Sequence, residues 1–276
     1  MINVSLKDDA FLGVCSSGNG NLDICPKYIN FDRENTHRTI IYTDRKIVEN
    51  LVDNYEGHNN IAWLLESKAI IPDVYKSILK NSYKYTYVLT HDTNLIKSLK
   101  NTYAKFCIVG GCWIREDDRK VYNKTKNLSI IASVKRMTDG HILRHEIIKR
   151  DDNFIEGIYG GGYNPIDNKI VALRDYRFSI VTENIINDDY FTEKLIDCFV
   201  TGTIPVYYGT KNVSKYFNKS GIIFIDSVED YRYKRCLINE TYYKSVYNSV
   251  LENFEIAKRY VNTEDWIYES YKNIFL

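Results

Sequence analysis

Residues 178–209 read FSIVTENIINDDYFTEKLIDCFVTGTIPVYYG, and this stretch decides the fold. Phe178–Thr182 is a short apolar and β-branched run, which is typical of a buried strand. From about Tyr190 the apolar residues fall at helical spacing, at Leu195, Ile196, Phe199 and Val200. Gly202 ends this helix, and Ile204–Tyr208 is a second apolar strand. A strand, a helix and a strand with short connections predict a βαβ unit with parallel strands.

The polar residues of this unit lie just past its first strand and around the start of its helix. They are Glu183, Asn184, Tyr190, Thr192, Glu193 and Lys194. Open α/β sheets bind ligands at this edge, outside the carboxyl ends of the strands. Lys194 and the helix N-terminus suit a phosphate, whereas the Glu193 carboxylate suits hydrogen bonds from sugar hydroxyls. A site that takes both a phosphate and a polyol indicates a nucleotide or a nucleotide sugar.

The spacing of these residues resembles a known family. Glu-Asn-x5-Tyr-x-Thr-Glu-Lys-Leu, followed by Ile-Pro-Val-Tyr-Tyr-Gly, is similar to the C-terminal donor-binding motif of the α1,3/4-fucosyltransferases, glycosyltransferase family 10. Taken alone, Glu193-Lys194 would indicate an ordinary solvated helix start, but the whole string matches at fixed spacing. The resemblance implies the GT-B fold, an α/β architecture of two Rossmann-like domains whose parallel sheets face a central cleft.

The N-terminal half alternates short apolar runs with helical segments, which predicts a second α/β sheet. Ile61–Leu65 is a buried-type strand with Glu66 at its carboxyl end, and Trp63–Ser67 resembles the family's Trp-x-x-x-Glu-Ser stretch. Gly110–Trp113 resembles the Tyr-Gly-Trp that closes the family's acceptor domain. We also expect a strand at Phe11–Cys15, a polar loop at Gly18–Asn21 and a helix over Lys46–Asn54.

These patterns predict two domains joined by a charged linker over Arg115–Lys126. Residues 1–120 would form the acceptor-side α/β domain, and residues 127–262 the nucleotide-sugar domain. A last helix, 263–276, could cross back to the first domain, as terminal helices do in two-domain transferases of this build.

The second domain opens with the strand Leu128–Ser133 and a helix, His141–Arg150, that carries Arg144. A serine after a strand followed by an arginine resembles the family's phosphate-binding segment, which makes Ser133 and Arg144 donor-binding candidates. Lys135 and Arg136 could join them or form a solvated basic loop. Gly160–Gly162 departs from the family's usual Gly-Arg or Gly-x-Gly, and it supplies no side-chain donor.

Sugar transfer with inversion needs one general base for the acceptor hydroxyl. Glu66 is our candidate, by its place at a strand end and by the resemblance, although it could instead cap the next segment or pair with Lys68. Glu183 is the rival carboxylate, and stabilising positive charge on the donor suits it better. Because the chain has no Asp-x-Asp, Arg144 and Lys194 would neutralise the leaving diphosphate, and we expect no essential metal and no cofactor.

The composition of the chain limits the kinds of partner that it is expected to bind. The chain has 276 residues and a formal net charge of +1, so a basic footprint for nucleic acid is missing. No apolar run approaches a transmembrane length, and the first residues lack the pattern of a signal peptide, so we expect a soluble, cytoplasmic protein of bacterial, phage or viral type. The six cysteines form no C-x-x-C pair and read as free thiols.

The sequence thus predicts an inverting glycosyltransferase that carries a sugar from a nucleotide donor, first GDP-fucose, to a glycan hydroxyl. The tri-glycine and the short acceptor domain leave open another donor, such as UDP-xylose or another UDP-sugar. A nucleotide-binding module without catalysis is the alternative from a different class. The presence of Glu66 together with Arg144, Glu193 and Lys194 argues against it, since a non-catalytic protein needs no base.

Overall fold

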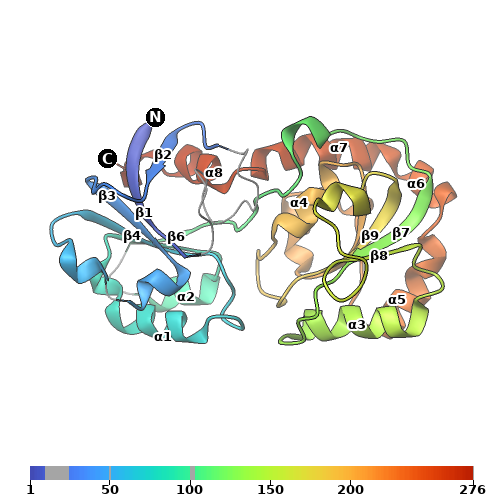
Figure 1. Cartoon of the computed structure of the whole chain (residues 1–276), viewed down its shortest axis with the longest axis horizontal. Helices are drawn as coiled ribbons and strands as arrows, with labels where there is room; N and C mark the ends of the chain where they lie inside the picture. The colour runs from blue at the N-terminus through green and yellow to red at the C-terminus, as the bar shows by residue number, and fades with distance from the viewer. Residues whose placement is uncertain (10–24, 50, 100–102, 276) are drawn as a thin grey trace. The chain divides into compact units, whose positions relative to one another are not determined.

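The computed structural model describes residues 1–9, 25–49, 51–99 and 103–275. The chain divides into two compact units. Unit 1 consists of Met1–Gly111, Asp188–Tyr190 and Asn262–Leu276, and unit 2 consists of Cys112–Asn187 and Phe191–Val261. Each unit contains one parallel sheet with helices packed against it (Figure 1).

The sheet of unit 1 has the strand order β2-β1-β3-β4-β5-β6. Its strands are β1 (Ile2–Lys7), β2 (Ile29–Asp32), β3 (Thr39–Thr43), β4 (Asn59–Leu64), β5 (Tyr87–Thr90) and β6 (Tyr103–Phe106). Helices α1 (Pro72–Asn81) and α2 (Thr93–Ser98) cover one face, and α8 (Thr263–Ser270) covers the other (Figure 1). Both faces are therefore buried: Ile40 packs on the α1 side, and Ile41 packs on the α8 side. This explains why β3 is buried along its whole length instead of alternating between buried and exposed residues.

The sheet of unit 2 has the order β11-β10-β9-β7-β8. Its strands are β7 (Lys126–Ile131), β8 (Gly157–Tyr159), β9 (Tyr176–Thr182), β10 (Ile204–Tyr208) and β11 (Ile223–Phe224). Its helices are α3 (Asp139–Asp151), α4 (Glu193–Phe199), α5 (Val228–Lys234), α6 (Glu240–Ser245) and α7 (Tyr247–Ala257). All seven residues of β9 are buried, because β9 is the central strand between β10 and β7.

The structure confirms the βαβ unit and two parallel sheets, with differences in detail. Helix α4 begins at Glu193 and not near Tyr190, because Thr192 caps it with a side-chain oxygen. The helix expected over Lys46–Asn54 is wrong: two 3₁₀ turns, Asp44–Ile47 and Leu51–Asn54, stand there. Strands β1 and β2 were not expected. The strand expected at 11–15 and the loop expected at 18–21 lie outside the described residues.

Pro205 lies in an internal strand, although its missing N–H suggests an edge or a bulge. On one side of β10, Pro205 stands opposite Ser179 of β9. On the other side, the pairing with β11 begins at Val206, opposite Ile223, so β11 pairs only from the residue after the proline. The proline is tolerated because one of its two neighbouring strands starts late.

Candidate functional site

A cluster of polar side chains lies at the start of α4 in unit 2, and Thr192 is at its centre. The Thr192 side chain accepts from the Lys194 backbone N–H as the N-cap, at 3.4 Å, and from Lys194 Nζ at 3.0 Å. The Thr192 hydroxyl donates a hydrogen bond to Glu183 Oε2, which lies 2.9 Å away. One hydroxyl has one proton and two lone pairs, so these three contacts use the full capacity of Thr192.

Glu183 is fully buried where β9 ends. Besides the Thr192 hydroxyl, its Oε1 accepts the Thr192 backbone N–H at 2.9 Å, and Lys194 Nζ lies 3.5 Å from Oε2. Burial raises the pKa of Glu183, against the opposing charge of Lys194. Glu183 therefore anchors the segment that leads into α4, and its oxygens face Thr192 and Lys194.

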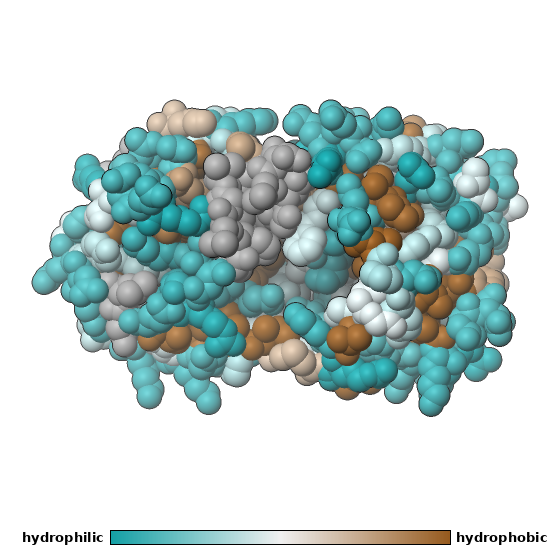
Figure 2. Space-filling view, viewed as in Figure 1, coloured by the Kyte–Doolittle hydropathy of each residue, from teal (hydrophilic) through white to brown (hydrophobic). Residues whose placement is uncertain are grey.

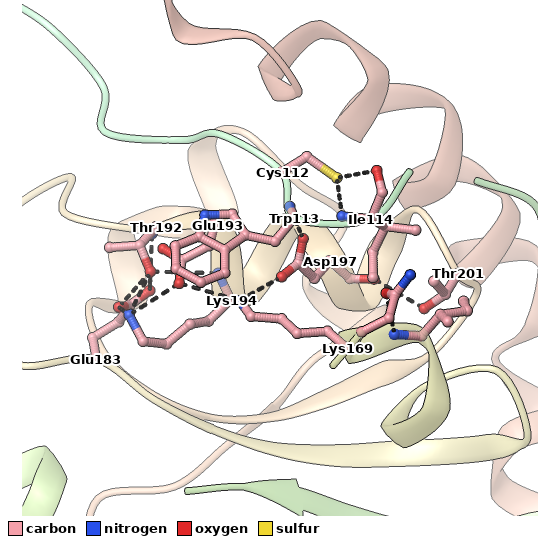
Figure 3. Close-up of polar contacts among 12 residues, drawn as sticks. Cys112, Trp113, Ile114, Lys169, Glu183, Thr192, Glu193, Lys194, Asp197 and Thr201 are labelled. Atoms are coloured by element: carbon pink, nitrogen blue, oxygen red, sulfur yellow. Dashed lines mark hydrogen bonds and ion pairs between the residues drawn. The ribbon is translucent and has the colours of Figure 1, made fainter. Parts of the chain in front are cut away.

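Glu193, the first residue of α4, lies between two lysines (Figure 3). Its Oε1 is 3.3 Å from Lys169 Nζ and 3.7 Å from Lys194 Nζ. Burial opposes the ionisation of Glu193, but the charges of Lys194 and Lys169 outweigh it and hold the pKa at about 2. Glu193 is thus a permanent anion at neutral pH.

Three further residues complete this cluster, and the sequence motif did not include them (Figure 3). Lys169 Nζ lies 2.8 Å from Asp197 Oδ2, and the Asp197 Oδ1 accepts the Trp113 backbone N–H at 2.7 Å. The Trp113 ring covers the Lys169 ammonium at 4.3 Å from its centroid. Asp197 follows Glu193 at i+4 on α4, a spacing that signals one helix face, but the positions of Lys169 and Trp113 depend on the fold.

Ser133 and Arg144 form a second polar group in unit 2, beyond the end of β7. Arg144 Nη2 donates to the Ser133 carbonyl at 2.9 Å, to the Ser133 hydroxyl at 2.8 Å and to the Lys135 carbonyl at 3.2 Å. The Arg144 Nε is buried and has no partner among the described residues. One donor of Arg144 is therefore unused in the described part of the chain.

The start of α3 packs against the end of β9. A Cβ on Gly140 would come within 1.9 Å of the Glu183 carbonyl oxygen, so only glycine fits this close approach. The next residue, His141, is buried, and its pKa falls to about 4 because of burial and the positive charges of Arg144, Lys194 and Lys135. The lysine at the start of α4 and the arginine of α3 therefore act on the same region, which favours an anion.

Glu66 lies in unit 1, half-buried just past β4. Its main chain is held on both sides: the Asp44 Oδ1 accepts the backbone N–H groups of Leu65 at 2.8 Å and Glu66 at 3.2 Å, and the Tyr75 hydroxyl donates to the Glu66 carbonyl at 3.1 Å. No described residue hydrogen-bonds to the Glu66 carboxylate. Asp44 has a left-handed backbone (φ 39°), and burial raises its pKa to about 7.

Two predicted residues remain, Asn184 and Tyr190. Asn184 is half-buried, directly after Glu183. Tyr190 belongs to unit 1, where its buried ring packs against His91 at a centroid distance of 4.5 Å. Unit 2 thus brings Glu183, Thr192, Glu193 and Lys194 into one cluster and Ser133 and Arg144 into another.

The described residues contain neither a metal-binding cluster nor a membrane-spanning helix. No set of three or more His, Cys, Asp or Glu side chains is placed to hold a metal ion within the described ranges. None of the helices described here combines the length and the apolar character that crossing a membrane requires. The face in Figure 2 is mostly hydrophilic, with its apolar residues in separate groups.

Two parallel sheets with helices, and polar groups where the strands of each sheet end, define a GT-B glycosyltransferase fold. A solved α1,3-fucosyltransferase matches with a TM-score of 0.55 and 14% identity, covering 99% of this chain and 90% of that chain. The same enzyme with GDP-fucose matches with a TM-score of 0.51 and 14% identity, over 92% and 81% of the two chains.

The family model of glycosyltransferase family 10 (fucosyltransferase), C-terminal part, matches residues 121–248 of this chain. The α-(1,3)-fucosyltransferase FucT of Helicobacter pylori is 35% identical over 86 residues, which are 29% of this chain and 18% of that protein. The matched part of this chain therefore spans less than a fifth of that relative. The family predicted from the motif at 183–195 is confirmed.

Proposed function

We propose that this protein transfers fucose from GDP-fucose to a hydroxyl group of a glycan acceptor, with inversion at the anomeric carbon. One observation carries the proposal: the residues that match the fucosyltransferase motif, Glu183, Thr192, Glu193 and Lys194, form one partly buried and charge-paired cluster at the end of the central strand. Such a pre-formed polar cluster suits the recognition of a nucleotide sugar. The Helicobacter pylori relative supports fucose as the sugar.

In this proposal Arg144 and Lys194 bind the diphosphate and stabilise its charge as it leaves, with Ser133 beside Arg144. Glu193 accepts hydrogen bonds from the ribose hydroxyls, and Asn184 and Tyr190 contribute hydrogen bonds to the donor. Since two cations are available to the diphosphate, we expect transfer to proceed without an essential metal. Transfer lost on chelation and restored by manganese would contradict this expectation.

Glu66 is the proposed general base. Its main chain is held on both sides, while its carboxylate has no hydrogen-bond partner among the described residues, so it is available to a ligand proton. The oxygen of the acceptor hydroxyl attacks the anomeric carbon, its proton passes to Glu66, and GDP leaves with the electrons of the broken bond.

A panel of nucleotides tests the donor class first. We expect GDP and GDP-fucose to raise the melting temperature of the protein, and UDP, UDP-xylose and other UDP-sugars to leave it unchanged. Stabilisation by the UDP series instead would keep the chemistry but replace the donor. Binding of GDP without release of fucose to any glycan acceptor or to water would favour a nucleotide-binding module.

A further inference from the structure

Lys169 lies at the centre of the charged cluster, although the donor-binding motif does not contain it (Figure 3). Its Nζ bridges two carboxylates that are one helical turn apart on α4, Glu193 at 3.3 Å and Asp197 at 2.8 Å. The Trp113 ring covers the ammonium, and the Lys169 side chain is only 18% exposed. A lysine held this closely constrains both carboxylates.

The charges of the cluster show why this position matters. Among the described residues, the three carboxylates of Glu183, Glu193 and Asp197 pair with two ammonium groups, those of Lys169 and Lys194. Glu193 is shared between the two lysines. Without Lys169, the second lysine would be the one cation left among these five groups, and it would be drawn toward Glu193.

We propose that Lys169 is a positioning residue of the donor site, which holds the Glu193 carboxylate for the ribose hydroxyls and leaves Lys194 available to the diphosphate. This rests on the proposed function, because it assigns Glu193 and Lys194 to a nucleotide. Lys169 acts through these two residues and not by touching the reacting atoms.

The surroundings of Lys169 suit this role. Its 3₁₀ turn, Lys169–Ala172, is capped by the Asn168 side chain, which accepts the Ile170 N–H at 3.1 Å. On the other side of the ammonium, Asp197 is 2% exposed and is fixed by the Trp113 N–H. Both ends of the bridge are therefore pre-organised before any ligand binds.

Calorimetric titration with GDP tests the inference on the wild type, K169M, K169R and K211M. Lys211 is the matched control, since it also pairs with one aspartate, Asp226 at 2.9 Å, but is 67% exposed. We expect K169M to bind GDP at least about tenfold more weakly, the size of one hydrogen bond to a charged group. K169R keeps a charged donor and should stay within about threefold, and K211M should match the wild type.

A double-mutant cycle with E193Q separates positioning from a general loss of stability. If Lys169 acts through Glu193, the K169M change should cost clearly less GDP affinity in the E193Q background than in the wild type. Fully additive losses in the cycle would overturn the inference. Melting temperatures of all variants serve as the folding check.

The remaining outcomes are distinguishable. A wild type that does not bind GDP contradicts the proposed function. A wild type that binds GDP together with a K169M variant that binds it equally well overturns only the inference about Lys169. If K169M does not fold, K169R decides. Arginine also supplies a fixed cation, so a folded K169R protein that loses about tenfold or more in GDP affinity overturns the inference.

Discussion

The carboxylates of unit 2 and the Glu66 carboxylate of unit 1 are held in opposite ways. Glu183, Glu193 and Asp197 are each paired through their side chains, with a lysine, a hydroxyl or a backbone N–H. Among the described residues, Glu66 is held through its main chain, by Asp44 and Tyr75, and its carboxylate has no hydrogen-bond partner. A paired carboxylate keeps its position, which suits binding, whereas a carboxylate without side-chain partners can exchange a proton with a ligand.

The largest effect expected from this comparison is on Glu66. E66Q keeps the size of the side chain and removes its basicity, so transfer should fall by about 10²–10⁴-fold, the usual contribution of a general base. GDP affinity should stay within a few-fold. The rate of fucose transfer measures the effect, and E34Q, which changes an exposed carboxylate of the same unit, is the control. Normal turnover by E66Q would remove Glu66 as the base.

The next largest effect concerns the two proposed diphosphate cations. R144A and K194A should each weaken GDP binding by about 1.5–3 kcal/mol, because each removes a charge-assisted hydrogen bond. Isothermal calorimetry measures the change, and K149A on the exposed side of α3 is the control. If both variants bind GDP like the wild type, the phosphate site is elsewhere, and the paired cluster of unit 2 is not the donor site.

A smaller effect is expected at Asp44, which tests whether main-chain support alone positions Glu66. D44A leaves the Leu65 and Glu66 N–H groups without their acceptor, so kcat should fall by about tenfold while the KM for the donor changes little. D44N retains a side-chain carbonyl and should lose less. Equal losses for D44A and D44N would show that the charge of Asp44 matters, not its hydrogen bonds.

The smallest effect is a pH dependence at His141. Its pKa in the folded protein is about 4, below the ordinary 6.5, so between these values the unfolded chain binds the extra proton. The stability that His141 contributes is therefore present above pH 6.5 and is lost as the pH falls toward 4. H141N should remove a slope of about 1 kcal/mol per pH unit from denaturant unfolding in that window. An unchanged slope would mean that burial and the nearby cations do not lower the pKa of His141 in the folded protein.

The sequence predicted what depends on local pattern. The change from strand to helix period located β9, α4 and β10, and the motif spacing led to the family. Lys169 could not be found in this way, because its partners lie 24 and 28 residues further along the chain and the pairing exists only in the folded sheet.

The errors have physical causes too. Over Lys46–Asn54 the apolar spacing suggested one helix, but two short 3₁₀ turns form after the left-handed Asp44. The missing N–H of Pro205 suggested an edge or a bulge position, because the sequence does not reveal where a neighbouring strand starts. Glu193 keeps its charge because the fold brings two lysines near it, and the sequence does not show which lysines these are.

The helix α8 and the residues after it cover one face of the sheet of unit 1. Asn59 donates to the Ile274 carbonyl at 2.6 Å, and Ile267, Ile274 and Phe275 join the core around Val4 and Trp63. During synthesis, the ribosome makes all of unit 2 before these residues emerge. The strands made first must therefore wait, with one apolar face uncovered, until the second half of the chain has been translated, and a ribosome that stalls before Asn262 leaves that face open to aggregation or to a chaperone.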